Sequence, residues 1–344
     1  MATLSNARRL LVFQRWPVLI ALFFTLLLSI FLCGIYLKFA RHWQILDQPN
    51  ERSSHQLPTP HGGGLPLFVA FSVGMFAAAV AGTDWPIQYL WLLLLAGGLV
   101  LVGVIDDVRG LSVPMRFATY GLCCAVAVQL IMGAMDGGIM GLLLATAAVF
   151  ALLWMLNLYN FMDGIDAYAA TQCFIACACA ALLAWRQGTD PAYPLFCLLL
   201  AAAHAGFLFW NWPPARLFMG DAGSIPTGFL LGSLALLGEV QGAVPLASWL
   251  ILLAAFIVDS TVTLLWRMGT GQPFTRPHRL HAYQRLSRKL GGHLPVVLLL
   301  LALNALWLGP LAFVAALNPK YSILLVILAY VPLVWGMAKV ADFR

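Results

Sequence analysis

The sequence predicts an all-α integral membrane protein, a bundle of about eleven transmembrane helices. It has 344 residues, of which 62% are hydrophobic and only 9% are charged, whereas charged residues make up about 25% of a soluble domain. So few charges cannot cover a water-facing surface, and apolar runs of about 20 residues recur along the chain. Lipid offers no partner to backbone N–H and C=O groups, so these runs are expected to be helices. Neither a composition shift nor a repeat divides the chain, and residues 1–344 are expected to form one membrane domain.

The expected spans follow one another with short polar links. They cover residues 17–37, 65–81, 87–105, 117–134, 138–158, 167–185, 193–212, 225–237, 244–266, 294–315 and 321–338. The eighth span is short. The first could pass for a signal peptide, but its apolar run is too long for an h-region and no small-residue cleavage site follows it.

Basic residues are distributed unevenly between the two sets of links. All of the 19 Lys and Arg residues except Arg8, Arg9, Arg15, Arg186 and Lys320 fall after odd-numbered spans or at the C-terminus. That side is therefore expected to be cytoplasmic, although the arginines ahead of the first span run against the assignment. The same asymmetry explains the net charge of +6, so this charge does not indicate nucleic-acid binding.

Five polar clusters interrupt the apolar pattern, and all of them fall on the predicted cytoplasmic side. The first is the loop 47–64, where prolines and three consecutive glycines open the backbone to close approach. Arg52, His55 and His61 in this loop offer hydrogen-bond donors to a phosphate. A plain loop with positive-inside charge is the alternative interpretation.

The second cluster is the pair Asp106 and Asp107 at the end of the third apolar run. Adjacent carboxylates in such a place are costly unless a cation or another partner compensates them. Mg²⁺ suits oxygen ligands of this kind and usually arrives with substrate phosphates. The alternative is an ordinary solvated helix end.

The third cluster places amides and carboxylates three residues apart, at Asn157, Asn160, Asp163 and Asp166. Residues at this spacing share one face of a helix. Such a periodic polar face at the end of a span indicates a binding site rather than a casual loop.

The fourth cluster runs from Asn211 to residue 224 and contains Phe218 and Asp221. Asp221 lies between glycines, where a metal ion or a phosphate can approach the backbone. Phe218 could stack on a nucleotide base, or be an ordinary interfacial aromatic residue.

The fifth cluster lies in the most basic loop and contains His278, Arg279 and His281. These side chains suit a pyrophosphate or a lipid headgroup. For the basic residues at 285–289, contact with anionic lipid is the favoured interpretation. Asp259, within the ninth span, is expected to face the bundle interior.

Acidic groups that can hold Mg²⁺, or Mn²⁺ in its place, thus face basic groups that can hold phosphates. This combination predicts phosphoryl transfer at the cytoplasmic membrane surface.

Four of these motifs together resemble the polyprenyl-phosphate N-acetylhexosamine-1-phosphate transferase family. They are Pro58-Thr-Pro60-x-Gly-Gly, Ile-Asp106-Asp107, Asn157-x2-Asn160-x2-Asp163-Gly-x-Asp166 and Phe218-Met-Gly-Asp221-x-Gly-Ser224. Two segments depart from the family pattern. Ala167-Tyr replaces Gly-Leu after Asp166, and the histidine-rich loop is reduced to His278-Arg-Leu-His281. With the opening at 47–55, this form resembles the branch that initiates O-antigen synthesis.

The resemblance implies a role for each site residue. Asp106 and Asp107 would activate the lipid phosphate, and Asp107 and Asp221 would bind the metal. His278 and His281 would lie in a loop that closes over the phosphates. The positions matched to uridine binding are Asn160, Asp163, Asp166, Asn211 and Phe218. The other expected substrate-binding residues are Arg52, His55, Asn157 and Arg279.

The resemblance implies transfer of a sugar 1-phosphate from a UDP-N-acetylhexosamine to undecaprenyl phosphate, with release of UMP. The sugar would be GlcNAc or a deoxy derivative such as FucNAc or QuiNAc. The setting would be the lipid bilayer of the bacterial inner membrane, at the first membrane step of O-antigen, lipopolysaccharide or related glycan synthesis. Two alternatives stay open, namely phospho-N-acetylmuramoyl-pentapeptide transfer and a non-catalytic transporter of lipid-linked sugar. Whether the chain forms a homodimer also stays open.

Overall fold

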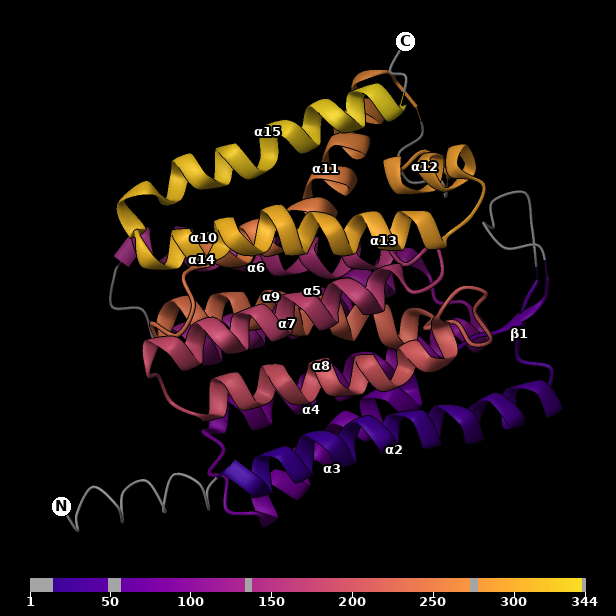
Figure 1. Ribbon diagram of the computed structural model, residues 1–344, viewed down its shortest axis with the longest axis horizontal. Helices are drawn as coiled ribbons and strands as arrows, with labels where there is room; N and C mark the ends of the chain where they lie inside the picture. Colours follow the sequence, from indigo (N-terminus) through magenta and orange to yellow (C-terminus); the bar gives the residue numbers. More distant parts are fainter. Residues whose placement is uncertain (1–14, 49–56, 134–137, 273–277, 342–344) are drawn as a thin grey trace.

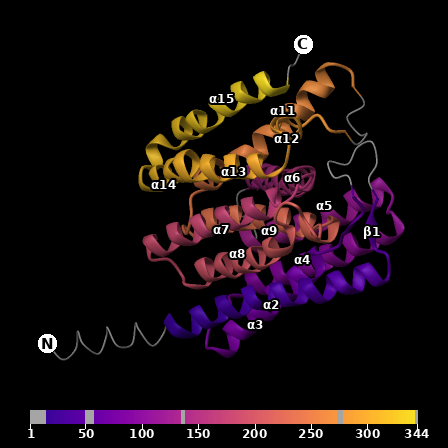
Figure 2. The same cartoon turned by 45° about the vertical axis from the view of Figure 1, so that its right-hand side comes forward.

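Helices make up almost all of the regular structure in the computed structural model, which describes residues 15–48, 57–133, 138–272 and 278–341. The helices α2 (Arg15–His42) and α3 (Gly64–Val80) lie along one side of the bundle, and α15 (Ser322–Ala341) lies along the opposite side (Figure 1). A view turned by 45° shows α7 (Tyr168–Gln187) and α8 (Ala192–Asn211) between these two sides (Figure 2). The prediction of an all-α bundle is confirmed.

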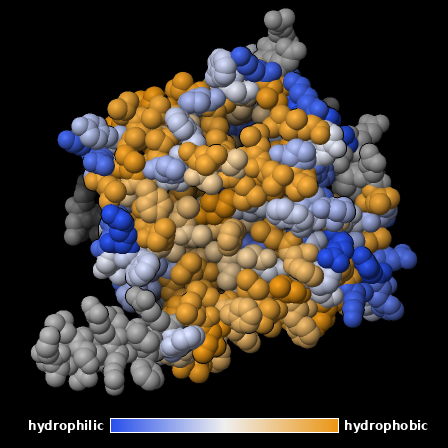
Figure 3. Space-filling view, in the orientation of Figure 1, coloured by the Kyte–Doolittle hydropathy of each residue, from blue (hydrophilic) through white to orange (hydrophobic). Residues whose placement is uncertain are grey.

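Nine helical segments in these described ranges are long and apolar enough to cross a membrane. Besides α2, α7, α8 and α15, they are α4 (Ile87–Arg109), α5 (Val113–Met132), α6 (Gly138–Phe161), α9 (Asp221–Val240) and the joined segment Leu294–Leu317. That last segment consists of α13 (Leu294–Leu303), the π-helix η1 (Asn304–Leu308) and α14 (Gly309–Leu317). Hydrophobic residues cover the middle of the visible face, and hydrophilic residues gather near its edges (Figure 3). The protein is therefore a multi-pass membrane protein.

The remaining two predicted spans are also helical, but in a different form. The helix α3 has 17 residues and is shorter than each of the nine segments named above. The predicted span 244–266 is not one straight helix, because α10 (Leu246–Leu252) and α11 (Ala254–Gly269) meet at an angle of 73°.

At the break between α10 and α11, backbone carbonyls lose their helical hydrogen bonds in an apolar environment. Gln172 of α7 compensates, since its Nε2 donates to the Leu252 carbonyl at 2.8 Å, and Asn304 Nδ2 donates to Gln172 Oε1 at 3.1 Å. Irregular backbone at membrane depth is tolerated only where protein supplies such partners. Local hydropathy carries no sign of this break, because the partner lies on another helix.

The centre of the bundle is α9, the most completely buried of the spans, which packs against α4 and α6. It begins at Asp221, four residues earlier than the predicted start of the eighth span. The residue ahead of it, Gly220, has φ +71°, a conformation that favours glycine. The turn at Gly220 therefore sets the position of Asp221 at the helix N-terminus.

The polar segments meet at one end of the bundle. Strands β1 (Leu46–Asp47) and β2 (Thr59–Pro60) pair in antiparallel register, Leu46 opposite Pro60 and Asp47 opposite Thr59. The short helix α12 (Ala282–Leu290) lies near the same end and packs against α13 and α15 (Figure 1). A single-turn 3-10 helix η2 (Pro319–Tyr321) precedes α15.

Candidate active site

Hydrogen bonds and close contacts connect the described parts of the five polar clusters. The amides of Gly63 and Gly64 donate to the carbonyls of Phe218 and Met219, both at 2.9 Å. These bonds hold the loop before α3 against the turn before α9. Gly64 packs directly on the backbone of Gly223 and leaves no room for a Cβ. The glycines predicted to allow close approach therefore serve to bring two distant segments into contact.

Two carboxylates from different helices meet at the start of α9. The backbone N of Asp221 lies 3.4 Å from Asp107 Oδ1. The other oxygen, Asp107 Oδ2, is buried and has no hydrogen-bond partner among the described residues. His61 approaches it, with Nδ1 at 4.0 Å. A buried carboxylate oxygen without a donor is costly, and it marks the place where a cation is expected.

Asp106 is engaged differently from its neighbour. Its Oδ1 accepts a hydrogen bond from the Leu111 amide at 2.6 Å, and its Oδ2 forms an ion pair with Arg116 Nη1 at 2.9 Å. The same guanidinium nitrogen lies 3.9 Å from Asp221 Oδ2. Arg116 thus stands between two acidic residues while a third of its side chain stays exposed. Sequence reasoning counted Arg116 only as a positive loop charge, although its position just after Asp106–Asp107 was a usable signal.

Asn160, at the end of α6, orients the carboxylate of Asp221. Its Nδ2 lies 2.7 Å from Asp221 Oδ1 and 2.8 Å from Ser224 Oγ. Asn157, one turn earlier, instead donates to the Leu153 carbonyl of its own helix at 2.7 Å. Of the two predicted amides, only Asn160 is therefore connected by a hydrogen bond to Asp221.

Asp163 and Asp166 lie in the link between α6 and α7. Burial raises the pKa of Asp163 well above its usual range, and the nearby carboxylates of Asp221, Asp166 and Asp107 raise it further. Asp166 is tied into the fold, because its Oδ2 accepts from the Ala215 amide at 3.0 Å and lies 3.1 Å from His293 Nδ1.

His293 was not singled out from the sequence. A histidine directly before an apolar run was the available signal.

Asn211 connects two loops around the same region. Its Oδ1 accepts from the Ala167 amide and its Nδ2 donates to the Leu217 carbonyl, both at 2.9 Å, and the side chain is buried. These bonds fix the segment that carries Phe218. Phe218 is partly exposed, and its predicted contact with a base stays a prediction.

The histidine loop is attached to the bundle through Asp259, whose partner the sequence did not reveal. Asp259 Oδ1 accepts from the Ala282 amide, and Oδ2 from the Tyr283 amide, both at 2.9 Å. His281 Nδ1 lies 3.2 Å from Oδ1. Asp259 therefore caps the N-terminus of α12, where the helix dipole favours a negative charge.

His278 lies beside His281, with ring centroids 4.8 Å apart. Burial lowers the pKa of His278 to about 4, and the neighbouring His281 and Arg267 lower it further. His278 is therefore neutral near pH 7.

Arg279 follows His278 in this partly buried loop, and its carbonyl accepts from Arg288 at 3.0 Å. Two other expected substrate-binding residues, Arg52 and His55, lie in 49–56, outside the described residues.

Within the described ranges, no three His, Cys, Asp or Glu side chains form a complete metal site. The carboxylate cluster of Asp106, Asp107 and Asp221, with Asn160 and Arg116, instead combines acceptors for a cation with a donor for a phosphate. These groups lie at one end of a membrane-spanning bundle. Fold and site together define a membrane-embedded protein suited to phosphate chemistry at the bilayer surface.

Comparisons with known proteins agree with this class. Residues 89–239 match the family model described as Glycosyl transferase family 4. The decaprenyl-phosphate N-acetylglucosaminephosphotransferase of Mycolicibacterium smegmatis is 30% identical over 310 residues, covering 78% of this chain and 74% of that protein. The chain belongs to the polyprenyl-phosphate N-acetylhexosamine-1-phosphate transferase family.

Two further relatives mark the range of this similarity. The probable undecaprenyl-phosphate N-acetylglucosaminyl 1-phosphate transferase of Bacillus subtilis is 27% identical over 282 residues, covering 78% of this chain and 77% of that protein. The phospho-N-acetylmuramoyl-pentapeptide-transferase of Shouchella clausii is 27% identical over 301 residues, covering 79% of this chain and 90% of that protein.

Proposed function

We propose that this protein transfers an N-acetylhexosamine 1-phosphate from a UDP-sugar to undecaprenyl phosphate and releases UMP. The observation that carries the proposal is the meeting of Asp107, Asp221, Asn160 and Arg116, which come from four different helices, at one end of the bundle. Relatives named for N-acetylglucosaminyl 1-phosphate transfer support the choice of an N-acetylhexosamine. The proposed setting is the bacterial inner membrane, at the first membrane step of O-antigen or a related surface glycan.

The reaction requires little proton transfer, because a phosphate monoester is already largely ionised near pH 7. An oxygen of the acceptor phosphate attacks the β-phosphorus of the donor. The bond from that phosphorus to the bridging oxygen breaks, and UMP leaves with the oxygen and its electron pair. The anomeric C–O bond stays intact, so the sugar keeps its configuration.

The chain's residues supply orientation and charge for this step. Arg116, partly exposed between Asp106 and Asp221, can donate to a phosphate oxygen. Asp106 is the positioning residue for Arg116, since both of its oxygens already accept hydrogen bonds. Asn160 fixes the rotamer of Asp221.

The residues that would hold Mg²⁺ are Asp107 and Asp221. Mg²⁺ usually binds through one or two carboxylates together with substrate phosphates. The buried, unpartnered Oδ2 of Asp107 beside Asp221 fits that requirement. When bound, the ion would neutralise charge on the reacting phosphates.

The test measures UMP release by the purified protein with undecaprenyl phosphate and Mg²⁺ across a panel of UDP-N-acetylhexosamines and UDP-N-acetylmuramoyl-pentapeptide. We expect release that needs the lipid, stops with EDTA and returns with Mg²⁺. Asp107→Asn should lower turnover on the order of 10²-fold or more. Asp106→Asn should lower turnover while UDP-sugar binding persists. The matched control is Asp84→Asn, an exposed aspartate in the link between α3 and α4.

The outcomes separate the candidate functions. Preference for the pentapeptide donor would assign the peptidoglycan reaction, which the reduced histidine loop disfavours. An absence of UMP release with every donor, from protein shown to be folded, would refute the enzymatic proposal. A transporter of lipid-linked sugar would then become the leading alternative.

A further inference from the structure

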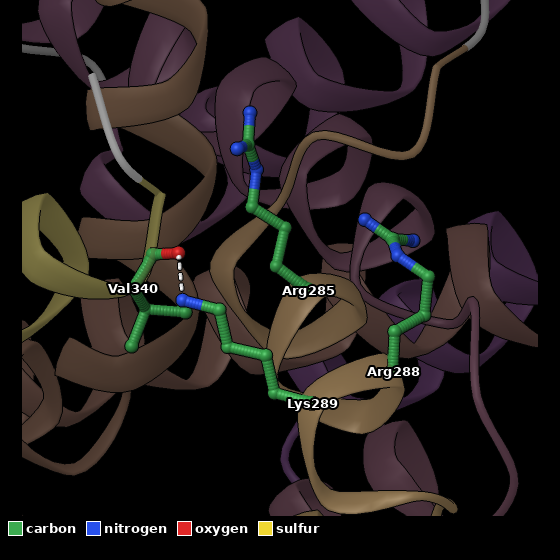
Figure 4. Close-up of a pocket in the computed structure, with 4 residues that line it drawn as sticks. All are labelled: Arg285, Arg288, Lys289 and Val340. Atoms are coloured by element: carbon green, nitrogen blue, oxygen red, sulfur yellow. Dashed lines mark hydrogen bonds between the residues drawn. The ribbon is translucent and has the colours of Figure 1, made fainter. Parts of the chain in front are cut away.

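A basic pocket lies outside the carboxylate cluster, between α12 and the end of α15. Its volume is about 330 Å³, and its lining residues are Arg285, Arg288, Lys289 and Val340 (Figure 4). Arg288 and Lys289 follow Arg285 by three and four residues, so both lie on the same side of α12 as Arg285. The opposite face, with Tyr283 and Ser287, is buried in the protein. The pocket thus gathers positive charge on the outer side of α12.

Arg288 and Lys289 each donate a hydrogen bond to a backbone carbonyl. Lys289 Nζ donates to the Val340 carbonyl at 3.0 Å (Figure 4). Arg288 Nη2 donates to the Arg279 carbonyl, also at 3.0 Å. A carbonyl satisfies a donor but does not cancel a full charge. Burial lowers the pKa of Arg288, and repulsion from Arg279 and Arg285 lowers it further. An anion in the pocket would relieve this repulsion.

The surroundings place the pocket at the level of lipid headgroups. Little of the α15 span is buried in the protein. Near its end, Trp335 is 62% exposed, and Lys339 Nζ lies 3.7 Å from the centroid of that ring. Exposed Trp and Lys residues are typical of the membrane–water interface. Leu290, next to the cations, is 48% exposed, which suits a helix end lying against acyl chains.

We propose that this pocket binds the phosphate group of an anionic phospholipid from the surrounding bilayer. Basic residues clustered on an amphipathic helix or between transmembrane helices are a recurrent kind of lipid-headgroup site. A soluble phosphate has the same charge chemistry. The lipid is favoured because the pocket adjoins the exposed apolar face of α15, where the acyl chains of a bound lipid would lie.

The site would also support the neighbouring histidine loop. Arg285 Nε donates to the Leu280 carbonyl at 3.0 Å, and Arg288 holds the Arg279 carbonyl. A bound phosphate would hold the same guanidinium groups from the other side.

The experiment compares lipid binding by the full-length protein in phosphatidylcholine nanodiscs with and without a minority of phosphatidylglycerol. Retained phosphatidylglycerol is counted by native mass spectrometry after gentle detergent extraction. The variant is Arg288→Gln/Lys289→Gln. The matched control is Lys38→Gln/Arg41→Gln, which removes two exposed cations three residues apart on α2. A basic residue near an anionic surface contributes about fivefold in affinity, so the variant should bind phosphatidylglycerol about thirty-fold more weakly.

Equal retention by the variant and the wild-type protein would overturn the proposal. Displacement of the lipid by millimolar inorganic phosphate or UDP would also overturn it, because the pocket would then belong to a soluble anion. Thermal unfolding checks that each variant is folded. If the double variant is not, Lys289→Gln alone serves, with an expected loss of about fivefold. The measurement involves no turnover, so its result is independent of the proposed enzymatic function.

Discussion

Gly103 controls how closely α4 approaches the N-terminus of α9. A Cβ added at this position would lie 2.6 Å from the Cα and N of Ala222 and 2.7 Å from the carbonyl carbon of Asp221. Three residues further along the same helix is Asp106, followed by Asp107. The substitution Gly103→Ala therefore perturbs the distance between these carboxylates and Asp221 without changing any of them.

The size of the effect follows from the contact distances. Ordinary van der Waals contact begins at 3.4 Å, and the atoms in the way are backbone atoms, which cannot rotate aside. The two helices must separate by roughly 1 Å, a displacement that can cost on the order of 10²-fold in rate even when the chemical groups are intact. Such overpacking also costs about 1–3 kcal/mol of stability.

The control is Gly98→Ala, in the same helix, where an added Cβ would meet nothing within 4 Å. UMP release, UDP-sugar binding and thermal unfolding are measured for both variants. We expect Gly103→Ala to lower turnover on the order of 10²-fold while remaining folded, and Gly98→Ala to keep wild-type turnover. Wild-type turnover in a folded Gly103→Ala protein would refute the idea that this helix contact sets the geometry of the site.

Three further substitutions test other parts of the site. Asp259→Ala removes the cap of α12 and should cost about 1–2 kcal/mol of stability. The loss is measured as a lower Tm and as faster proteolysis after residue 281. An unchanged Tm and proteolysis rate would disprove the capping role. His278 has a pKa of about 4 when folded against 6.5 for a free histidine, so its contribution to stability is complete above pH 6.5 and is lost as the pH falls towards 4. In His278→Gln the decline in Tm over that interval should be shallower, and an identical decline would contradict the assignment. Asn160→Leu leaves Asp221 without its amide donor and should lower turnover about tenfold or more. The control Asn157→Leu should lower turnover much less. Equal effects of the two substitutions would argue against a specific role for Asn160.

The sequence predicted the spans because the physical constraint on them is local. An apolar run of bilayer length has one way to satisfy its own backbone. In the described residues each predicted run is mainly helical, the run 244–266 as two helices. The candidate residues could be predicted for a similar reason, since acids at the ends of apolar runs need a partner. Spacing also predicted that Asn160 and Asp163 share one helix face, which is wrong because α6 ends at Phe161 and Asp163 lies in the link beyond it. It gave no means of separating Asn160, which reaches Asp221, from Asn157, which bonds within its own helix.

The sequence by itself therefore determined that this is a multi-pass helical membrane protein with acidic and basic groups at the ends of its spans. Only the tertiary structure decided which of these groups meet. Asn160 contacts a residue 61 positions away, Asp259 caps a helix 23 positions further along the chain, and Arg116 joins Asp106 to the start of α9. The bend between α10 and α11 likewise depends on Gln172 from another helix. Hydropathy and spacing describe each segment separately, whereas each of these contacts joins two segments whose approach is set by the packing of the bundle.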